Sequence, residues 1–252
     1  MDITAYLKRL GLDDSDVSHS YDFLCRLQYA HITHIPYENL DILRGKPISL
    51  EAEDIYRKIV TEHRGGYCFE LNALLHHMLA EMGFTVHSRF ARYLRGESTI
   101  PFRRHRIVTV TLADGEEYML DIDVGQVAPR LPLRLVEGEI QEQNGETYRF
   151  EWDPLLGWIL TDLHHGQWRR YISFTLEEQY ENDFAPASFW CEKHPDSPFN
   201  KSNMLAIKTP SGRKTLDGNV YKEFAADVCL RADTLPDADI PKILETAFGL
   251  KL

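Results

Sequence analysis

The sequence is poor in positive charge, and this limits the partners that the protein can bind. Its 252 residues include 39 acidic and 28 basic side chains, so the formal net charge is −11 at pH 7. A chain of this charge repels a polyphosphate backbone, which argues against general binding of nucleic acid. We therefore expect no nucleic-acid partner.

Long apolar runs are also missing. No uninterrupted apolar stretch approaches the ~18 residues that indicate a membrane-spanning helix. The first six residues, MDITAY, lack the basic-then-apolar pattern of a secretory signal. We therefore expect a cytoplasmic protein without a membrane partner.

Cysteine is scarce and scattered. The four cysteines, none in a Cys-x-x-Cys pair, are Cys25, Cys68, Cys191 and Cys229. This spacing argues against a disulfide framework and against a structural zinc site. A lone cysteine is usually a small buried apolar residue, so a catalytic role for any of them needs further support.

Two histidine pairs, at residues 76–77 and 164–165, suggest a metal site. Adjacent residues of a helix point in different directions, so a shared ligand site is not expected. We therefore expect no metal.

Patterns along the chain predict an α+β fold in three parts. Residues 1–85 are predicted to be helical, residues 86–184 are rich in strand-like alternation, and residues 185–252 mix strands with a last helix at 239–248. The proline-rich segment 185–199 is typical of a surface connection. The expected units are a helical domain, a β-rich domain and a C-terminal α/β domain.

Cys68 lies at the predicted start of a helix, directly after a turn with Gly65 and Gly66. The apolar residues that follow it recur at the spacing of one buried helical stripe: Leu71, Leu74, Leu75, Met78, Leu79 and Met82. Cys68 precedes Leu71 by three residues and shares that inward face. Free N–H groups at a helix start stabilise a thiolate and lower the pKa of a cysteine there. The position favours a reactive thiol over a structural one.

A predicted hairpin places a histidine beside two carboxylates. A two-residue Asp-Gly turn would separate His105 from both aspartates. A three-residue loop with Gly115 in the left-handed conformation brings Asp121 and Asp123 to the face of His105. The second register also produces a coherent core face: Val108, Val110, Leu112, Tyr118, Leu120 and Ile122. We therefore prefer the second register.

Thiol catalysis needs such an arrangement. The imidazole accepts the thiol proton, and a carboxylate fixes the tautomer and stabilises the imidazolium. The alternative is that the cysteine and the histidine are both structural.

Four ordered segments then carry a resemblance to the arylamine N-acetyltransferases. They are residues 34–40 (HIPYENL), 64–72 (RGGYCFELN), 118–121 (YMLD) and 194–199 (HPDSPF). The likeness spans nearly the whole chain, and the segment around the cysteine is highly specific.

The resemblance implies a fold and a catalytic triad. The implied fold is a helical bundle, a β-barrel-like domain and an α/β lid around a papain-like catalytic core. The implied triad is Cys68 as nucleophile, His105 as base and Asp121 as the orienting carboxylate. Asp123 is the alternative, because the hairpin places it opposite His105.

The resemblance also suggests ligand contacts. Gly125 stands at a position that resembles a backbone contact to coenzyme A, and Arg104 is a second candidate contact to that ligand. Tyr37, Val124 and Phe199 are the candidates for the acceptor substrate. Arg104 belongs to a run of six arginines between residues 89 and 106. The run is either a solvated strand face or a basic rim for an anionic ligand.

The chain departs from the family after Asp121. The family has a small residue and then Gly-Phe-Gly-Gly, whereas this sequence has Ile-Asp-Val-Gly-Gln at 122–126. Val124 removes an aromatic wall from the acceptor pocket, and Asp123 adds a charge near His105.

The expected activity is ping-pong transfer of an acetyl group from acetyl-CoA to an arylamine or arylhydrazine through a Cys68 thioester. The alternatives are an aromatic amide synthase that uses another thioester, and a homologue that binds small molecules without turnover. Glu38 and Arg64 either form a buried pair that positions the glycine turn, or Arg64 caps the preceding helix.

Overall fold

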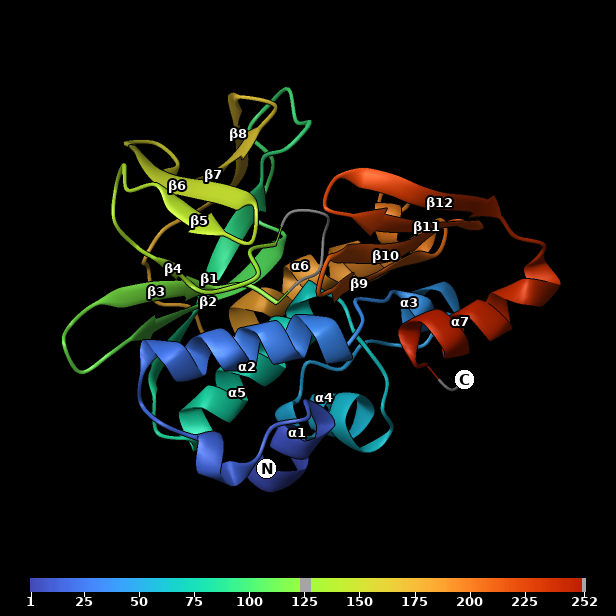
Figure 1. Ribbon diagram of the computed structural model, residues 1–252, viewed down its shortest axis with the longest axis horizontal. Helices are drawn as coiled ribbons and strands as arrows, with labels where there is room; N and C mark the ends of the chain where they lie inside the picture. Colours follow the sequence, from blue (N-terminus) through green and yellow to red (C-terminus); the bar gives the residue numbers. More distant parts are fainter. Residues whose placement is uncertain (123–127, 251–252) are drawn as a thin grey trace.

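The computed structural model describes residues 1–122 and 128–250. Figure 1 shows the N-terminal helices along the bottom, a large sheet at the upper left and a smaller sheet at the right. The predicted α+β content is confirmed. The division into three domains and the papain-like core stay predictions.

The chain is helical up to Glu81. Its helical elements are α1 (Ile3–Arg9), η1 (Asp14–Asp16), α2 (Tyr21–His34), α3 (Leu40–Leu43), α4 (Ala52–Tyr56), the π-helical turn η2 (Arg57–Thr61) and α5 (Cys68–Glu81). This agrees with the helical prediction for the first 85 residues.

Helix α5 begins at Cys68 as predicted and is followed by Gly83, whose φ is +86°. Its predicted apolar stripe is buried, with Leu71, Leu74 and Leu75 fully covered. The helix packs against strands β1 (Thr85–Tyr93) and β2 (His105–Thr111). One face of the sheet therefore holds the helix that carries Cys68.

The large sheet has eight antiparallel strands in the order β4-β3-β2-β1-β8-β7-β6-β5. The strands after β2 are β3 (Glu117–Leu120), β4 (Leu133–Arg134), β5 (Gln141–Gln143), β6 (Glu146–Asp153), β7 (Gly157–His164) and β8 (Gln167–Phe174). Met119 of β3 shares one buried core with Phe150 of β6, although four strands separate β3 from β6. The sheet therefore curls around its own apolar face.

The β2–β3 hairpin adopts the predicted register. Val108 pairs with Leu120, Leu112 donates its N–H to the carbonyl of Glu116, and Gly115 is left-handed with φ +85°. The predicted core face packs on the helices, with Val108, Val110, Tyr118, Leu120 and Ile122 in one cluster and Leu112 against it.

The C-terminal part builds a second, four-stranded sheet in the order β12-β11-β10-β9. Its elements are α6 (Glu181–Lys193), η3 (Pro198–Asn200), β9 (Met204–Thr209), β10 (Gly212–Asp217), β11 (Val220–Ala225), β12 (Val228–Thr234), η4 (Asp237–Asp239) and α7 (Ile240–Phe248). The predicted last helix corresponds to α7.

The prediction of a surface connection at 185–199 was wrong, because most of that segment belongs to α6. Pro186 lies inside the helix and removes one backbone donor. Buried residues at helical spacing, Phe184, Ala187, Ser188 and Cys191, compensate through tertiary packing. Because of the prolines, the local sequence pattern did not indicate this buried helical stripe.

Among residues 1–122 and 128–250, no helix combines the length and the apolar character needed to cross a bilayer. The cytoplasmic location stays a prediction.

We predict that Pro186→Ala raises the free energy of unfolding by about 1–2 kcal/mol. An interior proline costs a helix about 3 kcal/mol relative to alanine, and the more flexible unfolded chain offsets about 1 kcal/mol. The check is thermal denaturation, with Tm expected to rise by about 2–8 °C. The control is Pro198→Ala, since Pro198 opens η3, where no donor is needed. An unchanged Tm for Pro186→Ala would contradict the prediction.

Candidate active site

The turn before Cys68 is built against the segment that follows α2. A Cβ at Gly65 would lie 2.1 Å from the carbonyl oxygen of Pro36, so only glycine fits there. The N–H of Glu38 donates to the carbonyl of Gly66 at 2.9 Å. Tyr37 is buried between Gly66 and β9, where it bridges to Ala206. These contacts determine where the helix with Cys68 begins.

A buried network of ion pairs supports this turn. Arg64 donates to Glu38 at 2.6 Å and to Asp41 at 3.2 Å. Lys58 binds Asp41 at 3.0 Å and Glu70 at 2.7 Å. Of the two alternatives for Arg64, the buried pair with Glu38 is therefore the one that the structure shows. Burial opposes the charge on Arg64, but the two carboxylates outweigh it and raise the pKa of the guanidinium.

Glu70 connects the network to the backbone beside Cys68. Its second carboxylate oxygen accepts from the N–H of Tyr67 at 3.2 Å. Burial raises the pKa of Glu70, and Lys58 offsets part of that rise. The first turn of α5 is therefore positioned by charge as well as by packing.

Cys68 is buried, with 2% of its surface exposed, and its Sγ lies 3.9 Å from the carbonyl oxygen of Arg104. That carbonyl belongs to the residue before His105. The thiol therefore faces the chain at the point where β2 begins.

His105 and Asp121 form a buried pair across the β2–β3 hairpin. His105 Nε2 lies 2.8 Å from Asp121 Oδ2, with His105 5% exposed and Asp121 fully buried. A carboxylate on one ring nitrogen sets the tautomer of a histidine and favours its protonated form. The structure thus assembles the expected base and carboxylate. Asp123, the alternative carboxylate, lies outside the described residues.

Asn72 joins this pair to the helix of Cys68, and the sequence analysis assigned no role to it. Its Nδ2 donates to Asp121 Oδ1 at 3.0 Å and to the carbonyl of Arg106 at 2.7 Å. Its Oδ1 accepts from the N–H of Ile122 at 3.2 Å. Asn72 follows Cys68 by four residues, which places both on one helix face. That spacing was the available signal.

The remaining predicted contacts are placed as follows. Arg104 pairs with Glu97 at 2.8 Å. Phe199, half-buried in η3, has its ring centroid 6.0 Å from that of Tyr67, the residue before Cys68. Val124 and Gly125 lie outside the described residues.

The arginine run is neither a uniformly solvated face nor a continuous basic rim. Arg89 and Arg106 are buried, and Arg106 binds Ser88 and both carboxylate oxygens of Glu181. Arg103 pairs with Glu177. The buried members connect β1 and β2 to the segments around α6.

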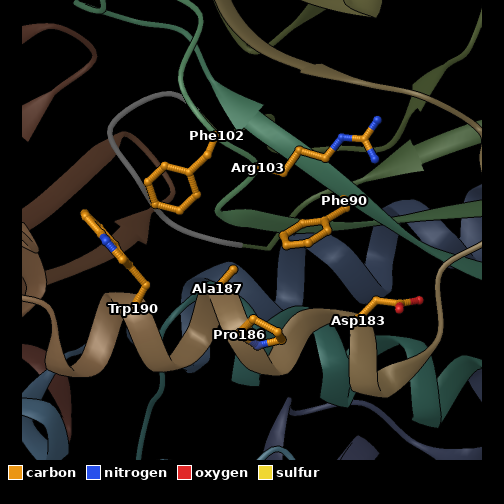
Figure 2. A pocket seen from close by; sticks show the side chains of 7 residues that line it. All are labelled: Phe90, Phe102, Arg103, Asp183, Pro186, Ala187 and Trp190. Atoms are coloured by element: carbon orange, nitrogen blue, oxygen red, sulfur yellow. The ribbon is translucent and has the colours of Figure 1, made fainter.

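An open apolar pocket of about 340 Å³ lies beside this site (Figure 2). Phe90, Phe102, Pro186, Ala187 and Trp190 line it, with Arg103 and Asp183 as its charged members. The ring centroids of Phe102 and Trp190 are 4.7 Å apart in an edge-to-face contact.

The two residues next to Cys68 contact elements that form the pocket. The hydroxyl of Tyr67 bonds to Ser188, the residue after Ala187 on α6. The ring of Phe69 lies edge-on to Phe90. Both residues that flank Cys68 therefore contact elements that also form the pocket.

The adjacent histidines 76 and 77 lie closer together than expected. Their ring centroids are 5.4 Å apart, and with Glu181 they offer three ligand atoms within 4.8 Å of one another. The expectation that the two rings diverge was wrong. Arg106 already occupies both oxygens of Glu181, at 2.7 and 2.6 Å, so a cation would have to displace it.

We predict that Asn72→Ala slows alkylation of Cys68 by iodoacetamide about tenfold at neutral pH. Losing the amide weakens the placement of Asp121, so the imidazolium and the thiolate are less stabilised and the pKa of the thiol rises. The measurement is the pH–rate profile of the full chain. Asn219→Ala, which removes an amide bonded to Leu235 in the small sheet, is the control. An unshifted profile for Asn72→Ala would exclude this role.

Comparisons with known proteins assign the chain to a family. A family model described as N-acetyltransferase matches residues 20–252. The arylamine N-acetyltransferase of Mycobacterium bovis is 34% identical over 260 residues, covering 100% of this chain and 90% of that protein. The arylamine N-acetyltransferase of Escherichia coli is 32% identical, covering 91% of this chain and 82% of that protein.

Solved structures share the fold. The Salmonella typhimurium arylamine N-acetyltransferase superposes with a TM-score of 0.93 at 31% identity, covering 98% of this chain and 90% of that one. A Mycobacterium marinum arylamine N-acetyltransferase in complex with CoA has a TM-score of 0.90 at 30% identity, covering 98% and 92%. The match extends over nearly the whole of each chain, and this chain belongs to the arylamine N-acetyltransferase family of acetyltransferase enzymes.

Proposed function

We propose that this protein transfers an acetyl group from acetyl-CoA to an arylamine or arylhydrazine through a thioester on Cys68. One observation carries the proposal. The His105–Asp121 pair is held by Asn72 against the same helix that presents the thiol. A nucleophile, a base and an orienting carboxylate are the groups that covalent acyl transfer requires.

In the first half-reaction, Cys68 becomes acetylated. Because His105 Nε2 bonds to Asp121, Nδ1 is the nitrogen that takes the thiol proton. The thiolate attacks the thioester carbonyl, the bond between that carbon and the CoA sulfur breaks, and CoA leaves as a thiol with the proton from His105. Asp121 stays ionised and stabilises the imidazolium.

In the second half-reaction, the amine nitrogen attacks the acetyl carbon. His105 accepts the proton that the nitrogen loses, the bond to Sγ breaks, and the amide leaves. Backbone N–H groups at the start of α5 are the candidate donors to the oxyanion in both steps, because they carry no intrahelical partner.

CoA as the acyl carrier is supported by the related Mycobacterium marinum enzyme, whose structure holds CoA. Gly125 and Arg104 stay the proposed contacts to it. The helical bundle, barrel-like sheet and C-terminal lid around a papain-like core complete the proposal. The curled large sheet and the contact of α5 with β1 and β2 support that layout.

The acceptor is proposed to bind between the pocket in Figure 2 and the thiol. Phe102 and Trp190 offer aromatic walls for an aryl ring, and such edge-to-face contacts contribute about 0.5–1.5 kcal/mol each. Tyr37, Val124 and Phe199 stay the other proposed acceptor contacts.

We predict that incubation with acetyl-CoA adds ~42 Da, one acetyl group, to the intact protein. The adduct should be absent from Cys68→Ala and present in Cys229→Ala, which removes an exposed cysteine far along the chain. An adduct formed only from an aromatic acyl-CoA would instead support the amide synthase. No adduct with any acyl-CoA would support a non-catalytic binder.

We predict that Trp190→Ala raises KM for an arylamine about tenfold without slowing acetylation of Cys68. The substitution removes an aromatic wall but no group that acts on the thioester. Steady-state assays over a panel of amines and hydrazines measure KM, and burst mass spectrometry measures acetylation. Leu155→Ala, at an exposed apolar residue that does not line the pocket, is the control. Unchanged KM values would remove the pocket from the proposal.

A further inference from the structure

A second cavity, of about 320 Å³, lies where the two sheets meet. On one side are the β5–β6 turn and the adjoining ends of β7 and β8. On the other are the turns at 210–211 and 226–227 of the small sheet. Figure 1 shows the β9–β10 and β11–β12 turns pointing toward the large sheet. The apolar pocket of Figure 2 has none of these residues in its lining.

The cavity is basic in a protein that is strongly acidic. Five basic side chains line it: Arg95, Arg130, Arg169, Lys208 and Arg213. Its acidic lining residues are three, Glu146, Asp162 and Asp227. The lining therefore carries an excess of positive charge, while the whole chain carries −11. A local excess of this kind is the electrostatic requirement for holding an anion.

Two of the basic side chains are buried deeply. Lys208 is 3% exposed and Arg130 4%. Lys208 Nζ binds Glu146 at 3.0 Å and the carbonyl of Ala128 at 2.5 Å, and Arg130 shares the same carboxylate at 3.3 Å. Burying a lysine and an arginine around a single carboxylate leaves positive charge uncompensated, which is costly without a further anion.

Three arginines that line the cavity each have one side-chain nitrogen without a hydrogen-bond partner within residues 1–122 and 128–250. These nitrogens are the buried Nε atoms of Arg95, Arg169 and Arg213. Arg95 and Arg169 both use their terminal nitrogens on one carboxylate, that of Asp162. Buried donors are normally satisfied, so the protein's own acceptors are too few for the arginines of this cavity.

We propose that this cavity binds a phosphate group, held by Lys208, Arg169, Arg213 and Arg95. A phosphate offers several oxygens to a ring of guanidinium and ammonium donors, and such charge-assisted bonds are short and strong. The volume accommodates a phosphate with part of the molecule that bears it.

The cavity is connected to the catalytic pair through one stretch of chain. Lys208 holds the carbonyl of Ala128, seven residues after Asp121. A phosphate bound here would therefore lie at the far end of the segment that leaves the active site. The phosphate belongs either to CoA, a case that rests on the proposed function, or to a separate compound.

The test is calorimetric titration of the full chain with sodium sulfate and with inorganic phosphate. We expect both anions to bind the unsubstituted protein, and Arg169→Gln and Arg213→Gln each to weaken binding about tenfold. The matched control is Arg170→Gln, which removes the neighbouring, more exposed arginine of β8 outside the cavity lining. Thermal melts check that each variant folds. No binding of either anion, or equal affinity in all three variants, overturns the proposal.

A second readout needs no substitution. Burial, with Arg130 and Arg213 adding to it, lowers the pKa of Lys208 to about 8 despite Glu146. An anion beside Nζ raises that pKa, so binding takes up protons at a pH of about 8.5. Sulfate does not titrate in this range. Titrations in buffers of different ionisation enthalpy should therefore report proton uptake with sulfate, and its absence contradicts binding at Lys208.

CoA and dephospho-CoA identify the source of the phosphate. If it is the 3′-phosphate of CoA, dephospho-CoA binds the unsubstituted protein more weakly than CoA, and Arg169→Gln abolishes that difference. If sulfate binds but the affinity for CoA is the same in Arg169→Gln, the cavity serves a separate phosphate compound. Neither result depends on acetylation of Cys68, so failure of the proposed function is seen independently.

Discussion

The arrangement of the proposed catalytic residues depends on one side-chain amide inside the protein. Asn72 ties the second turn of α5 to Asp121 and to the backbone of β2 and of the residue after Asp121. A buried carboxylate that loses such a donor costs about 1–3 kcal/mol, which exceeds what most single surface contacts contribute. Because the amide uses its oxygen and its nitrogen at once, the helix and the hairpin cannot shift independently. Cys68 and His105 keep their relative positions for this reason.

The start of α5 is also positioned by ion pairs and by a close backbone contact. Gly65 lets the backbone touch Pro36, and Arg64 and Glu70 anchor both ends of the turn. Buried ion networks contribute little net stability, but breaking one leaves charges without compensation. Such a network therefore specifies one position for the helix start. The proposed role of Cys68 as a nucleophile in the first helical turn requires such a defined position.

The basic residues fall into two groups: some are paired with acceptors of the protein, and others line the cavity between the two sheets. Arg89 donates to Thr109 of β2, and Arg106 donates to Glu181 of α6. Around Lys208 the carboxylates are too few, and donors stay unsatisfied among the described residues. The net charge does not reveal this contrast, because only the three-dimensional arrangement groups residues from β8, β9, β10 and the loop after β1.

The sequence by itself determined the helix at Cys68, the register of the β2–β3 hairpin and the placing of His105 and Asp121 on one face of that hairpin. These follow from short-range periodicity and turn chemistry, which act within a few residues. Helix α6 was missed, because burial at helical spacing outweighed Pro186 only once the fold existed. The tertiary structure alone decided the role of Asn72, the apolar pocket and the basic cavity. Each joins residues far apart in the chain, and no local pattern records which distant side chains will share a cavity.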